Sequence, residues 1–326
     1  MNQDTDMTPQ RGTPWLLSEI GFAPGPPRYL APEGATALAV VLGSGGVTPN
    51  PYRHGPSAAV IVNDMTFLID AGEGIWRGLA WAAMSHPEMI AEHLAPHRLT
   101  SLFLTHLHSD HTIGLPAVWL MPWAYGREVP LEVYGPVGTR NLMEHLEEAY
   151  QGDLQERRFG PGATDRKIDA HKIIPHEIKE SGLVYEDENV QIEAFHHEHG
   201  NFEQNFAYRF TSQDRVIAWA GDGRVEGQLD RAAEDADLFV CELSTEDMIA
   251  NANWGGATVE EKAKTIWSYH IRPKELAEFA TEMNVKQLVT VHERNYTDPY
   301  DPDALMQEFK RHYSGTVHSA RDGDVF

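Results

Sequence analysis

The chain has 326 residues, with 49 acidic and 26 basic side chains and a formal net charge of −23. This charge disfavours binding to nucleic acid and to anionic membranes, although it is compatible with a local basic pocket. The single cysteine, Cys241, excludes a disulfide framework and a thiolate metal cluster. Because no apolar run reaches membrane-spanning length and the chain starts with a polar segment, we expect a cytoplasmic protein, or a periplasmic one if a leader was removed.

The first 34 residues combine many prolines and glycines with a cluster of apolar side chains. Two interpretations stay open: a loose tail, or an arm strapped across its own subunit or across the partner in a homodimer. We expect one domain over residues 35–326, because a hydrophobic fraction of 41% supports a globular core.

Apolar runs bounded by turn residues predict a domain rich in strands. We expect strands over residues 37–42, 58–62, 67–69, 99–104, 130–136, 190–195, 206–210, 216–220, 238–242 and 286–292, and helices over 75–84, 137–150, 274–283 and 301–312. The strands fall into two halves, which fits a pseudo-duplicated sandwich. The glycine turn at residues 43–46 is not a dinucleotide-binding fingerprint, because its spacing is wrong and no helix follows it.

Residues 151–180 are polar and predict irregular structure. They carry the basic cluster of the chain, formed by Arg157, Arg158, Arg166, Lys167 and Lys172. A solvated face is favoured over a site for an anionic substrate. Earlier in the chain, His54 is expected on the surface more than in a pocket.

Residues 105–111 are the most informative segment, because they hold three histidines and an aspartate directly after a predicted buried strand. In an extended turn His106 and His108 point the same way, whereas Asp110 and His111 lie beyond the bend. One tetrahedral ion does not easily use all four groups from so short a segment. The pattern therefore suits two adjacent metals, and imidazole with carboxylate suits zinc, iron or manganese.

Tryptophans near this segment have two open interpretations. Trp119 and Trp123 follow it directly and either form an apolar wall over the metals or pack in the core. Trp254 and Trp267 lie in the long connection 245–268, which we expect near the catalytic face. Together these side chains suggest a partly apolar substrate.

The segment Phe103–His111 resembles the signature of the metallo-β-lactamase superfamily, and its neighbours look most like the ribonuclease Z and arylsulfatase-like branches. The resemblance runs from about Leu38 to the C-terminus, with the later motifs in the expected order. It implies an α/β (α+β) fold, the four-layer αββα sandwich of two mixed sheets with helices outside.

The resemblance also implies a ligand set for two divalent ions, most simply Zn²⁺, with iron or manganese as alternatives. The first ion would be bound by His106, His108 and His199. The second ion would be bound by Asp110, His111 and His292, with Asp222 bridging the two. His196 and His197 are reserve ligands for the position of His199. Asp70 is expected to orient a ligand histidine without binding metal.

Glu242 and His270 are the expected proton-transfer or substrate-orienting pair, and with Asp110 they are the catalytic candidates. Glu242 keeps the glutamate of the ribonuclease Z pattern. Cys241 stands where that pattern has a histidine, and Ile271 replaces the small hydroxyl residue that follows the later histidine. A protonated His270 would also stabilise charge that develops in the transition state.

Three functions compete. The leading expectation is a hydrolase in which a hydroxide shared by two metals cleaves a carboxyl ester or lactone, a sulfate ester or a phosphodiester in a small, partly apolar molecule. The alternative is a tRNA 3′-end endonuclease of the ribonuclease Z type. It is disfavoured by the acidic chain and because only residues 212–215 stand where ribonuclease Z inserts its tRNA-gripping arm. A third reading, a non-hydrolytic iron-binding redox member, lacks a flavin domain and persulfide-type ligands.

Overall fold

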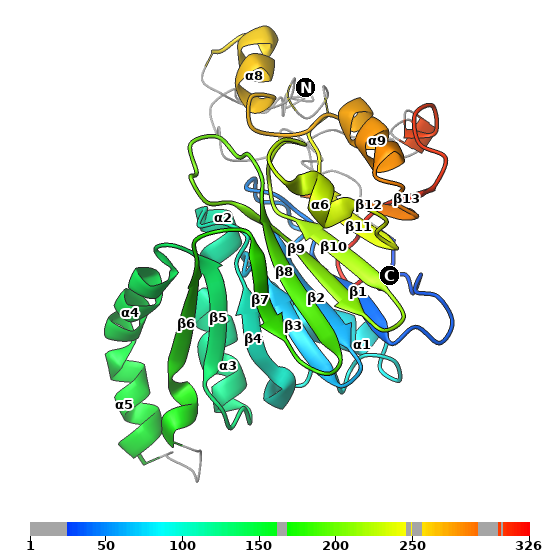
Figure 1. Cartoon of the computed structure of the whole chain (residues 1–326). Helices are drawn as coiled ribbons and strands as arrows, with labels where there is room; N and C mark the ends of the chain where they lie inside the picture. The colour runs from blue at the N-terminus through cyan, green and yellow to red at the C-terminus, as the bar shows by residue number, and fades with distance from the viewer. Residues whose placement is uncertain (1–24, 162–167, 246–248, 250–255, 293–305, 308) are drawn as a thin grey trace, which may run out of the picture.

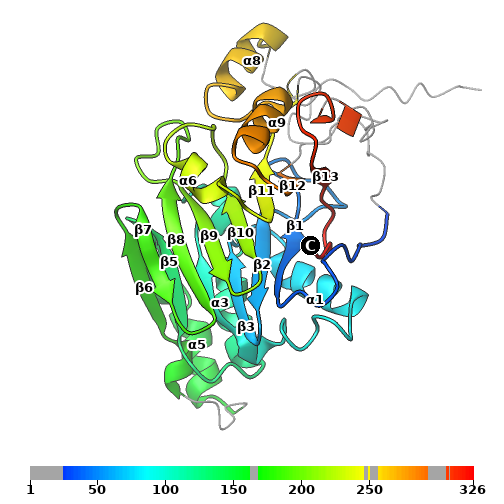
Figure 2. The ribbon, with the colours of Figure 1, turned by 45° about the vertical axis from the view of Figure 1, so that its right-hand side comes forward.

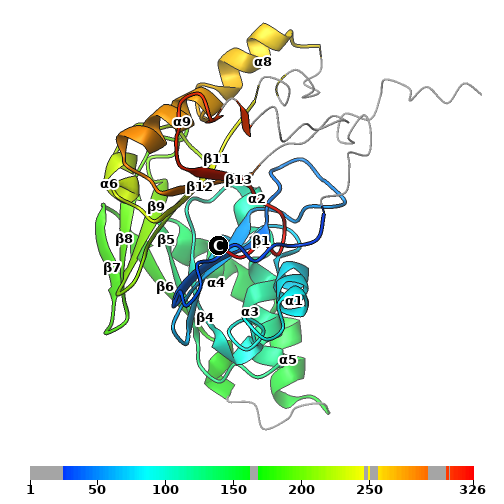
Figure 3. The same ribbon diagram turned by 90° about the vertical axis from the view of Figure 1, so that its right-hand side faces the viewer.

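The computed structural model describes residues 25–161, 168–245, 249, 256–292, 306, 307 and 309–326. Two mixed β-sheets lie face to face, and helices cover their outer sides (Figure 1). This is the four-layer αββα arrangement predicted from the sequence. Figure 3 shows the two helix layers on opposite sides of the paired sheets.

The first sheet has the order β1-β2-β3-β4-β5-β6. Its strands are β1 Ala37–Gly43, β2 Ser57–Val62, β3 Met65–Ile69, β4 Leu99–Phe103, β5 Leu131–Pro136 and β6 Ile173–Ile178. Strands β1 to β3 pair antiparallel, and strands β3 to β6 pair parallel. The parallel strands therefore present their carboxyl ends at one edge of the sheet.

The second sheet repeats this plan, with the order β13-β12-β11-β10-β9-β8-β7. Its strands are β7 Gly182–Glu186, β8 Val190–His196, β9 Phe206–Ser212, β10 Val216–Ala220, β11 Leu238–Glu242, β12 Gln287–Val291 and β13 Thr316–Ser319. Strands β7 to β10 pair antiparallel, and strands β10 to β13 pair parallel. The two sheets thus share the internal similarity expected of a pseudo-duplicated sandwich.

Alternating side chains of each strand serve two different cores. On β1, Ala39 and Val41 pack between the sheets, whereas Val40 and Leu42 pack under the helices of the first layer. Because both faces of the strand are buried, its sequence is a continuous apolar run without polar alternation. A third cluster joins the outer face of the second sheet to its own helices.

The helices of the first layer are α1 Ile75–Ser85, α2 Ser109–Thr112, α3 Leu115–Ala124, α4 Thr139–Ala149 and α5 Gln151–Phe159, with the 3₁₀ turns η1 Pro96–Arg98 and η2 Ile168–His171. The later helices are α6 Leu229–Ala233, α8 Val259–Ile266 and α9 Pro273–Glu282. No described helix is both long and apolar enough to cross a membrane. Half of the helix expected over 301–312, residues 301–305 and 308, lies outside the described residues.

The irregular structure expected over 151–180 is wrong for most of that segment, which contains α5, η2 and β6. Helix α5 gives a weak apolar pattern because Leu154 is its only buried side chain. Of its two basic residues, Arg157 is paired with a local acid, since its Nε lies 2.7 Å from an oxygen of Asp153, whereas the guanidinium of Arg158 lies over the ring of Phe159. Among the other basic residues, Arg166 and Lys167 lie outside the described part of the chain.

The start of the described chain is fastened to its end. Leu30 N donates to the carbonyl of Val325 at 2.6 Å, and the same C-terminal segment pairs with β1, where Phe326 N donates to the carbonyl of Ala39 at 2.8 Å. Figure 2 shows the C-terminus beside β1. The guanidinium of Arg28 lies 2.5 Å from the fully buried carboxylate of Asp324. These contacts favour a strapped arm for residues 28–30, whereas the apolar cluster before residue 25 is not described.

We expect Asp324→Asn to lower the free energy of unfolding by roughly 3 kcal/mol, because it leaves the Arg28 guanidinium without its buried counter-charge. Urea denaturation followed by circular dichroism measures the change. The matched control is Asp64→Asn in an exposed turn, which we expect to change stability by less than about 0.5 kcal/mol. Equal stabilities for the two variants would contradict a strap held by this ion pair.

Candidate metal centre

The candidate ligands meet where the carboxyl ends of strands from both sheets converge. His106 follows β4 of the first sheet, whereas Asp222 and His292 follow β10 and β12 of the second. His199 comes from the loop after β8. In sheets with parallel strands, the carboxyl ends are where ligand-binding side chains gather. The fold therefore unites residues that are far apart in sequence.

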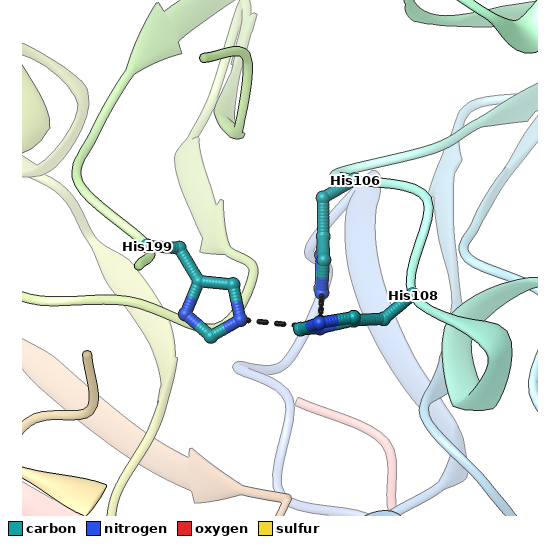
Figure 4. A group of neighbouring side chains, drawn as sticks. All are labelled: His106, His108 and His199. Atoms are coloured by element: carbon teal, nitrogen blue, oxygen red, sulfur yellow. Dashed lines mark hydrogen bonds between the residues drawn. The ribbon is translucent and has the colours of Figure 1, made fainter. Parts of the chain in front are cut away.

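His106, His108 and His199 form the first cluster, and one ring nitrogen of each lies within 4.8 Å of the others. His108 Nδ1 lies 2.9 Å from His106 Nε2 and 3.2 Å from His199 Nε2. Figure 4 shows these three rings pointing toward one another from two separate loops. Burial lowers the pKa of all three imidazoles, so each ring stays neutral near pH 7 and keeps a lone pair for a metal.

Asp110, His111, Asp222 and His292 form the second cluster, again with one ligand atom of each within 4.8 Å of the others. His292 Nε2 lies 3.2 Å from an Asp110 oxygen and 3.1 Å from an Asp222 oxygen. Although burial opposes ionisation, the hydrogen bond from His292 and the nearby His111 lower the pKa of Asp110 to about 2. His292 and His111 likewise lower the pKa of Asp222, so both carboxylates are held ionised, as metal ligands require.

Asp70 supports a ligand of each cluster through hydrogen bonds. His111 Nδ1 donates to Asp70 Oδ2 at 2.8 Å, and Thr105 donates its backbone N–H to Asp70 Oδ1 at 2.8 Å. The hydroxyl of Thr105 also donates to Asp70 and lies 3.0 Å from His106 Nδ1. One carboxylate thereby directs the opposite nitrogens of His106 and His111 toward the clusters. This is how a supporting residue orients metal ligands.

The donor set fits two divalent cations. His199 Nδ1 donates to the carbonyl of Tyr269 at 2.9 Å, which leaves Nε2 to face the first cluster. His111 Nε2 is buried without a hydrogen-bond partner among the described residues, and a bound cation would satisfy it. Convergent imidazole and carboxylate ligands suit zinc, iron or manganese, so the metal identity stays open.

Glu242 and His270 lie beside the second cluster. His270 Nδ1 is 2.5 Å from Glu242 Oε1, which also accepts the backbone N–H of Gly223 at 3.0 Å. Gly223 has a φ of 154°, and an added Cβ would lie 2.6 Å from the ring of His197, so glycine is needed for this approach. Burial, reinforced by Asp222, raises the pKa of Glu242 to about 8.

A pocket of about 490 Å³ opens over both clusters. Five of its lining residues belong to the site itself: His108, Asp110, His199, Asp222 and His270. The other lining residues are Val47, Ser109, Gly200, Asn201, Phe202 and Tyr269. The pocket thus combines ionisable groups at the clusters with an uncharged, partly aromatic wall.

Residues 65–292 match the family described as Beta-lactamase superfamily domain. The match covers more than half of the chain and contains every residue of both clusters. The chain belongs to the metallo-β-lactamase superfamily. The resemblance inferred from residues 103–111 is thereby confirmed.

Curated relatives in this superfamily carry the name ribonuclease Z. The chain is 27% identical to ribonuclease Z of Mycobacterium sp. (strain KMS) over 265 residues, covering 80% of this chain and 85% of the relative. Ribonuclease Z of Mycobacterium bovis is 25% identical over 287 residues, or 86% of this chain and 95% of the relative. The name matches the alternative considered from the sequence and not its leading expectation, the hydrolase of a small ester.

Solved structures support the superfamily fold. The human tRNase Z short form has a TM-score of 0.61 at 22% identity, covering 89% of this chain and 98% of that one. The metallo-beta-lactamase fold protein YhfI from Bacillus subtilis has a TM-score of 0.64 at 17% identity, with the same coverage of both chains. At these identities the likeness concerns the fold alone.

Three histidines lie at the end of β8 and just after it, and among them His199 belongs to the first cluster. His197 is buried against Gly223, and His196 packs edge-on against Phe206 with ring centroids 6.4 Å apart. Neither belongs to a described group of metal-binding side chains. The assignment of His199 as the ligand therefore remains the better prediction.

Of the two interpretations left open for Trp119 and Trp123, the structure supports packing in the core and not a wall over the metals. Trp119 and Trp123 are 0% and 1% exposed and belong to the core under the first sheet, where Trp119 Nε1 donates to the carbonyl of His171 at 2.6 Å. Trp267 instead donates to the carbonyl of Ser244 at 3.2 Å, and Trp254 lies outside the described residues. The connection 245–268 is also not all loop, because it contains α8.

A hydrogen-bond network around Asp322, which was not predicted from the sequence, supports the loop after β1. Asp322 accepts the backbone N–H of Ser44 at 2.8 Å and that of His54 at 2.6 Å, and thereby holds the loop after β1. The hydrogen bond with Asp322 also raises the pKa of His54. His54 is thus partly buried in this network and does not line the pocket. Within the loop, an added Cβ on Gly46 would lie 3.0 Å from the ring of His292.

We expect Asp70→Asn to weaken metal affinity by about 10- to 100-fold, because the charge that orients His106 and His111 is lost. Asparagine is the suitable replacement because Asp70 has a φ of 55°, which asparagine tolerates. Chelator competition with metal analysis by mass spectrometry measures the change. Unaltered affinity, equal to that of Asp64→Asn, would contradict the orienting role.

Proposed function

We propose that the chain is a two-metal phosphodiesterase of the ribonuclease Z class. The main support for this proposal is that two relatives named ribonuclease Z align over 80% and 86% of the chain. A ribonuclease cleaves phosphodiesters, so these relatives favour a phosphodiester substrate over a carboxyl ester or a sulfate ester. The family match contains both clusters, which supports the same active centre for this reaction.

The residues that would hold the two ions are those of the two clusters, with Asp222 between them. Two such cations lower the pKa of a coordinated water and neutralise charge on a phosphoryl oxygen. The chain's own contribution is to keep His106, His108 and His199 neutral and to keep Asp110 ionised. Asp70 keeps His106 and His111 turned toward the ions.

The Glu242–His270 pair supplies the proton for the leaving group. Its geometry supports this role because Glu242 fixes Nδ1 of His270 while the ring of His270 lines the pocket. Glu242 is buried and does not line the pocket itself, so it acts through His270 as a positioning residue. Transfer of a proton to the departing alkoxide contributes about 10²- to 10⁴-fold to such reactions.

We expect purified protein to hydrolyse bis(p-nitrophenyl) phosphate or a precursor tRNA faster than p-nitrophenyl acetate, p-nitrophenyl sulfate or a lactone. Chelation removes this activity, and added Zn²⁺ or Mn²⁺ restores it, because both clusters need a cation. Asp110→Ala abolishes the activity because the second ion loses a ligand. Kinetic assays on the same panel, with Asp64→Asn as the control, measure these effects. Turnover of only the carboxyl or sulfate esters would overturn the phosphodiesterase.

A phosphodiester in a small molecule is the second candidate substrate, and three observations favour it. β9 and β10 are joined by residues 213–215 alone, so the hairpin has no room for an RNA-gripping arm. The described lining of the pocket contains no lysine or arginine. The net charge of −23 also opposes a long polyanion. Cleavage of the aryl diester without cleavage of precursor tRNA would select this substrate class.

We expect Glu242→Gln and His270→Gln each to lower kcat by about 10²- to 10⁴-fold, with little change in metal content. The loss is larger for a diester with a poor alkoxide leaving group than for one with p-nitrophenolate, which departs without protonation. Steady-state kinetics on both substrates, with metal analysis of each variant, measures this difference. An equal loss on both leaving groups would exclude proton donation by this pair.

A further inference from the structure

The pocket has an apolar wall whose residues the proposed reaction does not use. Val47 lies in the loop after β1 and is 53% exposed, Phe202 lies three residues after His199, and Tyr269 precedes His270. The remaining neutral lining comes from small or polar side chains. A substrate group in this part of the pocket meets rings and methyl groups instead of charges.

Phe202 is held in place by the first cluster. Its ring centroid lies 4.5 Å from that of His108 in an edge-to-face contact and 5.4 Å from that of His106. It is parallel to His199 within 4° at 6.0 Å. The ring is only partly buried and also lines the pocket. Its position is therefore fixed before any substrate enters.

Tyr269 is fixed from the other side of the same site. Its backbone carbonyl accepts from His199 Nδ1 at 2.9 Å. Its ring centroid lies 4.6 Å from that of His270 and 5.7 Å from that of His199. Phe202 and Tyr269 thus stand next to the position of the reacting bond, on two rigidly attached loops. Preorganised aromatic side chains bind planar groups at low cost in conformational entropy.

The charges around the pocket limit what this wall can hold. Its ionisable lining consists of groups assigned to metal binding or proton transfer, and the described lining has no cationic side chain for a second phosphate. A volume of about 490 Å³ lies in the range of small-ligand pockets. The group beyond the reacting phosphate must therefore be compact, uncharged and largely apolar.

We propose that Phe202 and Tyr269 form a subsite for a planar, uncharged ring attached to the scissile phosphodiester. The ring is either the aryl group of a small diester or a single nucleobase next to the cleaved bond. This inference rests on the proposed phosphodiesterase and adds its substrate preference. Val47 lines the same pocket and adds an aliphatic side chain to it.

The test compares diesters that share p-nitrophenolate as the leaving group and differ in the other ester group: methyl, phenyl or thymidine 5′. We expect the wild-type protein to prefer the two ring-bearing esters, and Phe202→Ala and Tyr269→Leu to lower this preference by about tenfold. The methyl ester serves as the internal control because its second ester group has no ring, so any contribution of the shared p-nitrophenyl ring cancels in the comparison. Tyr125→Ala, at a 70% exposed aromatic outside the pocket, keeps the wild-type preference.

A binding measurement separates this inference from the proposed function. Phenylphosphonate binds the metal-loaded wild-type protein more tightly than methylphosphonate, by calorimetry, and Phe202→Leu removes the difference while metal content stays unchanged. Preferences that stay at the wild-type ratio in both Phe202→Ala and Tyr269→Leu would overturn the subsite, even with an active phosphodiesterase. If no diester is cleaved, the proposed function fails, and the phosphonate difference still decides the subsite. Preference for thymidine over phenyl assigns the subsite to a nucleobase, and the reverse to an aryl group.

Discussion

The candidate metal centre depends on one buried carboxylate. Asp70 directly follows β3 with a φ of 55° and accepts hydrogen bonds from Thr105 and His111, so it supports a ligand of each cluster. His292, at the end of β12 in the other sheet, has a φ of 57°. Non-glycine residues rarely adopt this conformation and keep it only where the surroundings enforce it. Each sheet thus holds one strained residue at the point where the two halves of the fold meet.

Charge compensation explains how so many ionisable groups stay buried in a strongly acidic protein. Burial opposes the charge on Asp222, yet His292 and His111 hold its pKa well below the usual value. Burial likewise opposes charge on His111, yet Asp222 and Asp70 together raise its pKa well above the usual value, so a cation bound at His111 Nε2 would take the place of a proton. A buried charge is tolerated only when it is paired. The second cluster therefore keeps its carboxylates ionised, whereas the first consists of neutral imidazoles whose ring nitrogens already converge.

The sequence predicted what depends on local spacing and motif order, and missed what depends on tertiary packing. Strand ends and the residues of both clusters follow from residues 105–111 and the order of later motifs. The residues that line the pocket do not follow from the sequence in this way. Helix α3 is apolar on every side, so its sequence does not reveal that Trp119 faces the core and not the pocket. Phe202 lies in a loop without periodicity. Arg28 and Asp324 pair across almost the whole chain, which no local pattern indicates.

The metal centre determines which kind of bond can be cleaved, whereas the loops around it determine which substrate is selected. The clusters and the Glu242–His270 pair suit any ester that two cations and a proton donor can cleave, and one fold hosts many such reactions. Selectivity must come from loops around the centre, where side chains vary without disturbing the ligands. In this chain those loops carry Phe202 and Tyr269, and β9 passes to β10 through a short turn. A chain related to ribonuclease Z thus keeps the centre, and the subsite that we propose on its described rim would hold a single ring.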